Sequence, residues 1–402
     1  MKRTTLLHAL SVFSLVFFGS LAKADFPVDP SFDAGFIFDT QTEGLTGDNS
    51  GNLYTAGRAG SMGLDSTVCP VWRINVPAGT VSLVGTLPNP CRPSGLAFDR
   101  NGPLFVVDGT NNVIFRLNNP NSNSTPSANV FATGVAGANA VAIDKDGNVW
   151  TGDGTTGQGR VWKITGPNAS CSPASLSKCQ EIFRVQPMAN EVNLNAGVGG
   201  IGRDVRALGP GTITVTPTSR NAANTAGSQP LVANGLAFNL DGDLLVADTA
   251  RGTIWKVKFN SDGTLASQTG CDTTFTSNTL CLNNIFVTHP IIEGADGIAL
   301  DQAGNIWVAA NERNAIAVIA ADGKVDEIFR NQPDDTTKLR NTGPMEFPTS
   351  PFLLGNRFCT SHTDGGRRDN FPNSPGVVPA SGGKVNCMIE TLQIPGLPLP
   401  VQ

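Results

Sequence analysis

The chain has 402 residues, of which 40% are hydrophobic and 15% charged, and its formal net charge is −5 at pH 7. This acidic balance argues against nucleic acid as a partner, and the sequence has no polybasic patch of the kind that binds membrane surfaces.

The first 24 residues predict a cleaved secretory signal. They begin with Lys2 and Arg3, continue with an apolar run from Leu6 to Leu21 and end with Ala22-Lys23-Ala24. No later apolar stretch approaches the roughly 20 residues that a membrane-spanning helix needs. We therefore expect an exported protein, periplasmic or extracellular, whose mature domain covers residues 25–402. Loss of the three basic signal residues leaves 25 basic against 33 acidic side chains.

Five segments share one pattern, in which a short apolar strand is followed by a tight turn on Asp, Asn or Gly and by a second apolar strand. This is a hairpin signature. The segments are "EGLTGDNSGNLYTAG" from Glu43, "SGLAFDRNGPLFVVD" from Ser94, "NAVAIDKDGNVWTGD" from Asn139, "NGLAFNLDGDLLVAD" from Asn234 and "DGIALDQAGNIWVAA" from Asp296. A third strand follows most copies, as "VWRI" from Val71 and "TIWKV" from Thr253 illustrate.

Repeats of strands alone, at intervals of about 45 to 60 residues, are typical of a β-propeller. A shorter sixth copy, "TSPFLLGNRFCTSH", starts at Thr349. We therefore predict an all-β fold, a six-bladed β-propeller, closed by a strand near 36–39 that pairs with the region 385–389. Residues 165–230, rich in Asn, Gly, Ser, Thr and Pro, are expected to form an insertion at the rim.

The eight cysteines predict local disulfides, because they occur as near neighbours and an exported protein meets an oxidising compartment. None forms a CxxC pair, which makes zinc binding the weaker alternative. The expected pairs are Cys69 with Cys91, Cys171 with Cys179, Cys271 with Cys281 and Cys359 with Cys387.

The repeats place one polar residue at a constant position, eight residues before each turn glycine. Because the innermost strands of a propeller run parallel to the channel axis, these residues should meet in a ring at one mouth. The ring consists of Glu43, Ser94, Asn139, Asn234 and Asp296, with Thr349 as the sixth member. Every member offers oxygen, and two carboxylates this close favour a hard divalent cation such as Ca²⁺. The alternative is that polar residues merely line a solvated channel mouth.

At these residues the chain resembles the senescence marker protein/gluconolactonase (regucalcin-like) family. The resemblance is most specific at "EG" (Glu43), "ANGLAF" (Asn234) and "ADGIALDQAGNIWVA" (Asp296). It implies a six-bladed propeller whose central divalent metal serves hydrolysis of lactone esters. By position it implies that Glu43, Asn139, Asn234 and Asp296 bind the metal, which is Ca²⁺ or another divalent cation such as Zn²⁺, Mg²⁺ or Mn²⁺. It also implies that Asp296 is the general base.

The chain departs from the family pattern at several places. The family often has an arginine two residues before the third-blade asparagine, where this chain has Gly137, and an acidic residue after that asparagine, where it has Ala140. Leu45 and Gly47 replace the usual proline and tryptophan after "EG". The metal site can thus persist while recognition of sugar lactones is lost or rebuilt.

The sequence predicts a metal-dependent lactonase or esterase, a monomer that acts on a small-molecule lactone or ester. Ser94, Thr349, His362 and Arg203 are the candidate pocket residues. A second hypothesis is a ligand-binding or scaffold propeller without catalysis. A third is a relative of strictosidine synthase or paraoxonase that uses a different residue, for which Glu293 would be the marker.

Overall fold

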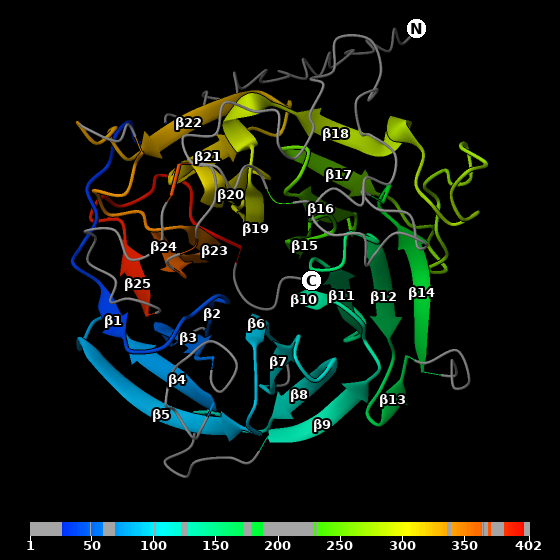
Figure 1. The fold of residues 1–402 in the computed structure, drawn as a ribbon, viewed down its shortest axis with the longest axis horizontal. Helices are drawn as coiled ribbons and strands as arrows, with labels where there is room; N and C mark the ends of the chain where they lie inside the picture. Colours follow the sequence, from blue (N-terminus) through cyan, green and yellow to red (C-terminus); the bar gives the residue numbers. More distant parts are fainter. Residues whose placement is uncertain are drawn as a thin grey trace, which may run out of the picture.

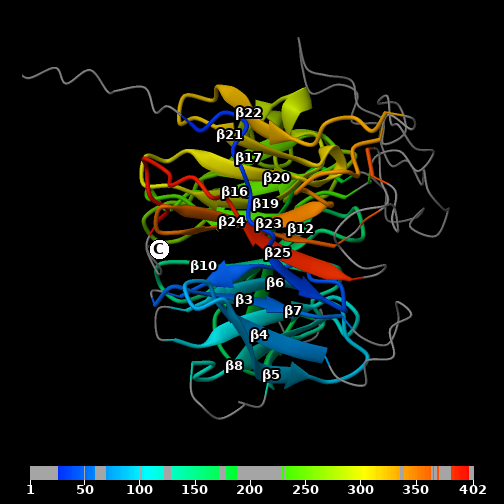
Figure 2. The same ribbon diagram turned by 90° about the vertical axis from the view of Figure 1, so that its left-hand side faces the viewer.

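The computed structural model describes residues 26–48, 50–58, 69–99, 102–121, 128–171, 178–187, 229, 231–335, 339–363, 365, 369–370 and 382–397. These residues form six antiparallel sheets arranged radially about one axis, as Figure 1 shows down the axis and Figure 2 from the side. The predicted six-bladed β-propeller is confirmed. The predicted signal at residues 1–24 lies outside the described residues.

The first three blades follow the order of the chain, each beginning with its innermost strand. Blade 1 consists of β2 (Thr46–Gly47), β3 (Asn52–Ala56), β4 (Cys69–Asn75) and β5 (Thr80–Leu87). Blade 2 consists of β6 (Pro93–Phe98), β7 (Leu104–Asp108), β8 (Val113–Leu117) and β9 (Ala128–Thr133), with the short β13 (Ala169–Ser170) added in parallel to β9. Blade 3 consists of β10 (Ala138–Ile143), β11 (Val149–Asp153), β12 (Arg160–Ile164) and β14 (Cys179–Arg184).

The other three blades continue the same order. Blade 4 consists of β15 (Leu236–Phe238), β16 (Leu244–Asp248), β17 (Thr253–Val257) and β18 (Ile285–Thr288). Blade 5 consists of β19 (Ala295–Leu300), β20 (Ile306–Ala310), β21 (Ala315–Ile319) and β22 (Val325–Arg330). Blade 6 consists of β23 (Pro348–Leu354), β24 (Arg357–His362), β25 (Gly383–Cys387) and β1 (Phe36–Phe38). Short 3₁₀ helices occur at η1 (Leu282–Asn284), η2 (Pro290–Ile292) and η3 (Asn311–Arg313).

The ring closes in blade 6, where the two ends of the chain share one sheet. β1 is the outermost strand of this blade and pairs antiparallel with β25, so that Phe36 lies opposite Val385. The pairing of residues near 36–39 with residues near 385–389 was predicted, and the structure adds that blade 6 is the blade that they complete. Among the described residues, no helix is long and apolar enough to cross a membrane.

Part of the predicted insertion belongs to the blades. Ala169–Ser170 pair with β9, and Cys179–Arg184 form the outer strand of blade 3 along β12. The segment 188–228 lies outside the described residues.

The four predicted disulfides are confirmed. They join Cys69 to Cys91, Cys171 to Cys179, Cys271 to Cys281 and Cys359 to Cys387. Two of them join strands of the propeller. Cys171, at the end of β13 on blade 2, is tied to Cys179 on blade 3, and Cys359 on β24 is tied to its cross-strand partner Cys387 on β25.

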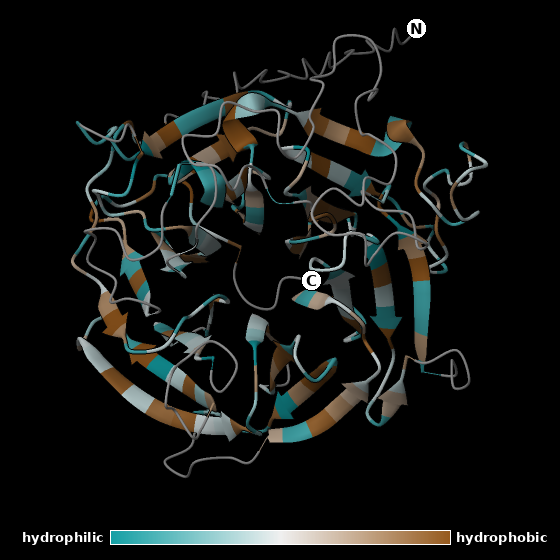
Figure 3. Cartoon of the chain, viewed as in Figure 1, coloured by the Kyte–Doolittle hydropathy of each residue, from teal (hydrophilic) through white to brown (hydrophobic). Residues whose placement is uncertain are grey.

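The core of the protein lies between the blades. Each pair of neighbouring blades shares one hydrophobic cluster, such as that of Trp150 and Trp255 between blades 3 and 4 or that of Trp307 and Phe358 between blades 5 and 6. Figure 3 shows hydrophobic and hydrophilic residues alternating along the outer strands. This alternation fits sheets that pack through the faces of their strands.

Glycine follows the ring residue in four blades, and the packing of the innermost strands explains why. A Cβ at Gly44 would lie 1.8 Å from the carbonyl oxygen of Ser94, and a Cβ at Gly235 would lie 2.2 Å from that of Asp296. Gly95 and Gly297 face the carbonyl oxygens of the next blades at 2.6 Å. The innermost strands thus approach each other so closely that backbone meets backbone at the channel mouth.

Substitution of Gly235 by alanine tests this close approach. The new methyl group would overlap a backbone oxygen of the next blade, so we expect the free energy of unfolding to fall by about 1–3 kcal/mol. Denaturant unfolding measures the change. Gly166→Ala is the matched control, because a Cβ there meets nothing within 4 Å and its stability should stay within about 0.5 kcal/mol. Equal stability of the two variants would contradict the packing argument.

Candidate functional site

β-Bulges fall at the ring residues of four blades. In blades 2, 3, 5 and 6 the register between the first two strands shifts by one residue, and the shift falls at the ring residue. In blade 3, for example, Ala138 pairs with Asp153 whereas Val141 pairs with Thr151, which leaves Asn139 and Ala140 in the bulge. A bulge re-aims a side chain and commonly lies next to a functional site.

The structure brings the four predicted metal ligands to one cavity at the centre of the propeller. Glu43, Asn139, Asn234 and Asp296, from four different blades, all line it. Three of them are buried, with Asn234 2% and Asp296 6% exposed, whereas the Glu43 side chain is 14% exposed. The Asn139 amide Nδ2 donates to Asn234 Oδ1 directly across the gap between blades 3 and 4.

Residues at the end of the second strands orient two of these ligands. Thr249 donates its hydroxyl proton to the Ala295 carbonyl at 2.7 Å and therefore accepts from Asn234 Nδ2 at 3.0 Å. This assignment turns the Asn234 oxygen toward the cavity. In the next blade, Asn311 Nδ2 donates to Asp296 Oδ2 at 2.8 Å. In blade 3 the equivalent residue is Gly154, where a Cβ would lie 2.7 Å from the Cβ of Asn139.

In blade 1 the equivalent residue is an arginine. The Arg58 guanidinium pairs with Glu43, and its Nη1 donates to Gln41 Oε1 at 3.0 Å. Arg58 is 6% exposed, and burial, with repulsion from Arg92, lowers its pKa to about 9 against the attraction of Asp296. The guanidinium therefore stays charged at neutral pH and compensates the charge of Glu43.

Asp296 is the second carboxyl of the site, and its pKa is raised. Burial raises its pKa to about 7, although hydrogen bonding to Asn311, the charge of Arg58 and hydrogen bonding to Asn234 act in the opposite direction. The nearby Glu312 adds a small further increase. Around neutral pH this carboxyl exchanges a proton readily.

The two hydroxyl residues of the ring serve the contacts between blades. Ser94 Oγ donates to the Asn139 carbonyl at 2.7 Å, and Thr349 Oγ1 donates to the Glu43 carbonyl at 2.6 Å. Both were candidate pocket residues. Their hydroxyl groups point at backbone carbonyls of the next blade rather than at the side chains of the four ligands.

The remaining candidate pocket residues lie elsewhere. His362 is fully buried in blade 6, where its Nδ1 accepts from the Glu346 backbone at 3.1 Å and its Nε2 lies 2.8 Å from Asn386 Oδ1. Burial and the charge of Lys384 hold its pKa well below the usual range. Arg203 lies outside the described residues.

Sequence reasoning missed Arg58 and Thr249, although a signal was present. Both stand seven residues after a turn glycine, Gly51 and Gly242, and Asn311 stands seven after Gly304. An aspartate such as Asp248 recurs six positions after the glycine and is easier to notice in the sequence. The residue that contacts the ring is the next one, seven positions after the glycine.

The donor set fits a hard divalent cation. It offers two carboxylates and two amide groups, and rotation of the Asn139 amide would present its oxygen beside that of Asn234. Oxygen ligands of this kind favour Ca²⁺, Mg²⁺ or Mn²⁺ over zinc. Within the described part of the chain, no three His, Cys, Asp or Glu side chains gather as a metal site, so the amides are essential to the set.

The raised pKa of Asp296 makes the stability of the metal-free protein depend on pH. Unfolding returns this carboxyl to its ordinary pKa of 3.8, so the folded state binds the extra proton between about pH 4 and 7. Its contribution to stability is full below pH 4 and is lost as the pH rises through 7, at up to about 1.4 kcal/mol per pH unit. Denaturant unfolding with chelator should show a smaller loss from pH 5 to 8 in Asp296→Asn. An unchanged slope would contradict the assignment.

Known proteins match the chain in sequence. A model of the SMP-30/gluconolactonase/LRE-like region matches residues 194–339. Lactonase drp35 of Staphylococcus epidermidis is 24% identical over 290 residues, which cover 68% of this chain and 80% of the relative. Lactonase drp35 of Staphylococcus aureus is 25% identical over 281 residues, which cover 65% and 76%.

Solved structures match the fold. A luciferin-regenerating enzyme aligns with a TM-score of 0.55 at 14% identity, covering 92% of this chain and 98% of its own. Regucalcin of Agrobacterium tumefaciens, described as a calcium-binding protein, aligns with a TM-score of 0.52 at 13% identity, covering 94% and 98%. The family model and the lactonase relatives confirm the resemblance to the SMP-30/gluconolactonase/LRE-like family, and the solved structures confirm the propeller fold.

Proposed function

We propose that the protein is an exported hydrolase of lactone or related ester bonds that depends on a divalent metal. The observation that carries the proposal is the convergence of Glu43, Asn139, Asn234 and Asp296 on one buried cavity from four blades. Two further facts support it. Relatives at 24–25% identity are named lactonases, and four disulfides suit an oxidising compartment outside the cytoplasm.

The residues of the site have separate roles in this reaction. When bound, a divalent cation supplies Lewis-acid polarisation of the ester carbonyl and neutralises the two carboxylates. Asn234, oriented by Thr249, holds its oxygen toward the centre, and Asn139 would present its oxygen after rotation of its amide. Asp296 takes a proton from the water whose oxygen attacks the carbonyl carbon. The ester C–O bond then breaks, and the proton passes to the leaving alkoxide oxygen, which yields a hydroxy acid.

Metal removal tests the dependence on a cation. The purified protein should open lactones of a panel when Ca²⁺, Mg²⁺, Mn²⁺ or Zn²⁺ is present, and chelator should abolish the rate reversibly. Asn234→Ala should lower metal affinity in calorimetry by about tenfold or more, since it removes an oriented oxygen ligand. A protein that binds metal tightly but opens no ester would favour the alternative of a ligand-binding or scaffold propeller.

A pair of substitutions tests the general base. Asp296→Asn should lower kcat by about 10²- to 10⁴-fold, because the group that accepts the proton is lost. Glu293→Gln removes a buried carboxylate three residues earlier and should retain activity within a few fold. Thermal unfolding of both variants checks that they are folded. Loss of activity in Glu293→Gln alone would instead indicate chemistry like that of strictosidine synthase or paraoxonase.

A further inference from the structure

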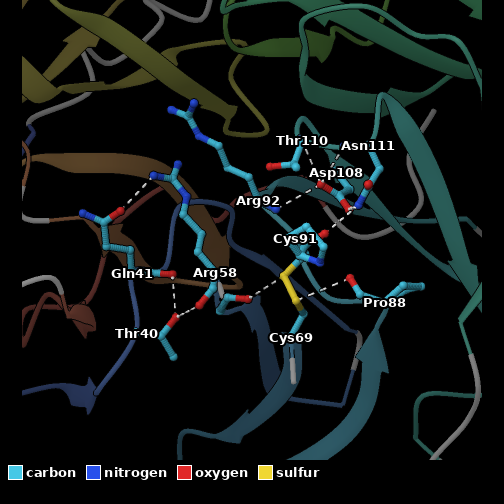
Figure 4. Close-up of a disulfide and its surroundings, with 12 residues drawn as sticks. Thr40, Gln41, Arg58, Cys69, Pro88, Cys91, Arg92, Asp108, Thr110 and Asn111 are labelled. Carbon is cyan, nitrogen blue, oxygen red and sulfur yellow. Dashed lines mark hydrogen bonds between the residues drawn. A yellow bond between two sulfur atoms is a disulfide. The ribbon is translucent and has the colours of Figure 1, made fainter. Parts of the chain in front are cut away.

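Two arginines lie together at the channel mouth where blades 1 and 2 meet. Arg58 follows Gly57, which bridges to Thr42, and Arg92 follows Cys91 and immediately precedes β6. Cys91 Sγ lies 3.7 Å from the Gly57 carbonyl oxygen. Figure 4 shows both arginine side chains extending away from the disulfide toward the same side.

The backbone that carries Arg92 is held from three directions. The disulfide of Cys91 with Cys69 ties it to blade 1. The Arg92 N–H donates to Asp108 Oδ1 at 3.0 Å, and the Arg92 carbonyl accepts from the Gly109 N–H at 3.1 Å. The base of this side chain is therefore fixed at the mouth.

The two guanidinium groups differ in what they contact. Arg58 is buried and already paired with Glu43 and Gln41. Arg92 is exposed, although surrounding protein atoms partly desolvate its guanidinium and lower its pKa. Among the described residues the guanidinium forms no hydrogen bond or ion pair, whereas the Arg92 backbone N–H donates to Asp108. The two positive charges are close enough for Arg92 to lower the pKa of Arg58. Because Arg58 is compensated by Glu43, the charge of Arg92 remains uncompensated.

We propose that Arg92, backed by Arg58, is an anion subsite that binds a carboxylate carried by the substrate. The substrate class would then be lactones or esters that bear a carboxylate outside the bond that is cleaved, an inference that rests on the proposed function. A guanidinium can donate two parallel hydrogen bonds to a carboxylate, and one free guanidinium matches one negative charge.

The position of Arg92 agrees with this role. Arg92 belongs to blade 2 and Asp296 to blade 5, and these blades lie opposite each other in a ring of six. A substrate whose reacting carbonyl lies beside Asp296 would extend its far end toward Arg92. The subsite would therefore hold the part of the molecule that does not react.

Binding of an inert anion tests the subsite without any turnover. Calorimetry compares tetrahydrofuran-2-carboxylate with the neutral tetrahydrofurfuryl alcohol on the full mature protein. We expect the carboxylate to bind at least about tenfold more tightly, and Arg92→Gln to lose most of that preference. Arg73→Gln, which removes one positive charge from β4 of blade 1, should retain it. No measurable carboxylate preference in the wild type, or a preference that survives Arg92→Gln, would overturn the proposal.

Kinetics then separate the subsite from the reaction. The ratio of kcat/KM for 5-oxotetrahydrofuran-2-carboxylate to that for γ-valerolactone should fall about tenfold in Arg92→Gln, through KM rather than kcat. Arg92→Lys should restore part of the ratio because it restores the charge. If neither lactone is opened but the carboxylate binds through Arg92, lactone hydrolysis fails and the subsite stands. If both lactones are opened and the ratio does not respond to Arg92, the subsite fails and lactone hydrolysis stands.

Discussion

The site depends on how closely the innermost strands approach each other at one mouth of the channel. Gly44, Gly95, Gly235 and Gly297 let the backbone of one blade contact the ring carbonyl of the next, which sets a narrow ring. In blades 3 and 5 a bulge falls at the ring residue, Asn139 or Asp296, whose side chain lines the cavity. The Ser94 and Thr349 hydroxyl groups add hydrogen bonds to these contacts between blades. The close packing of the innermost strands therefore also brings the oxygen ligands together.

Charge at this mouth is compensated in two different ways. A buried carboxylate is costly unless it is paired or protonated. Glu43 is paired with Arg58, whereas Asp296 is relieved by a proton near neutral pH and by its hydrogen bond from Asn311. These arrangements allow the propeller to close without a cation. A cation at the ring would share Glu43 with Arg58 and would replace the proton of Asp296, so metal binding and protonation compete for the same carboxyl.

The repeat and the ring were predictable because their signals are local. Turn glycines, strand alternation and the constant offset of the ring residues all lie within fifteen residues of each other in each repeat. The paired cysteines are also near in sequence, 8 to 28 residues apart. The closure of blade 6 joins Phe36 to Val385, and sequence located the strands but not the blade. Cys179–Arg184 was mistaken for insertion because an outer strand needs only one apolar face. The pairing of Arg58 with Glu43 was missed because both residues lie beyond the ends of β2 and β3, where the period of two no longer holds.

The polar residues around the ring are distributed unevenly, so that oxygen ligands lie on one side of the mouth and arginines on the other. Blades 3 to 5 contribute Asn139, Asn234 and Asp296, supported by the neutral side chains of Thr249 and Asn311. Blades 1 and 2 contribute Arg58 and Arg92, and Arg58 is paired with Glu43. Because opposite charges attract, the first side favours a cation and the second side favours an anionic group. A ligand with both a polarisable carbonyl and a carboxylate would accordingly enter in one orientation, with its reactive end beside Asp296.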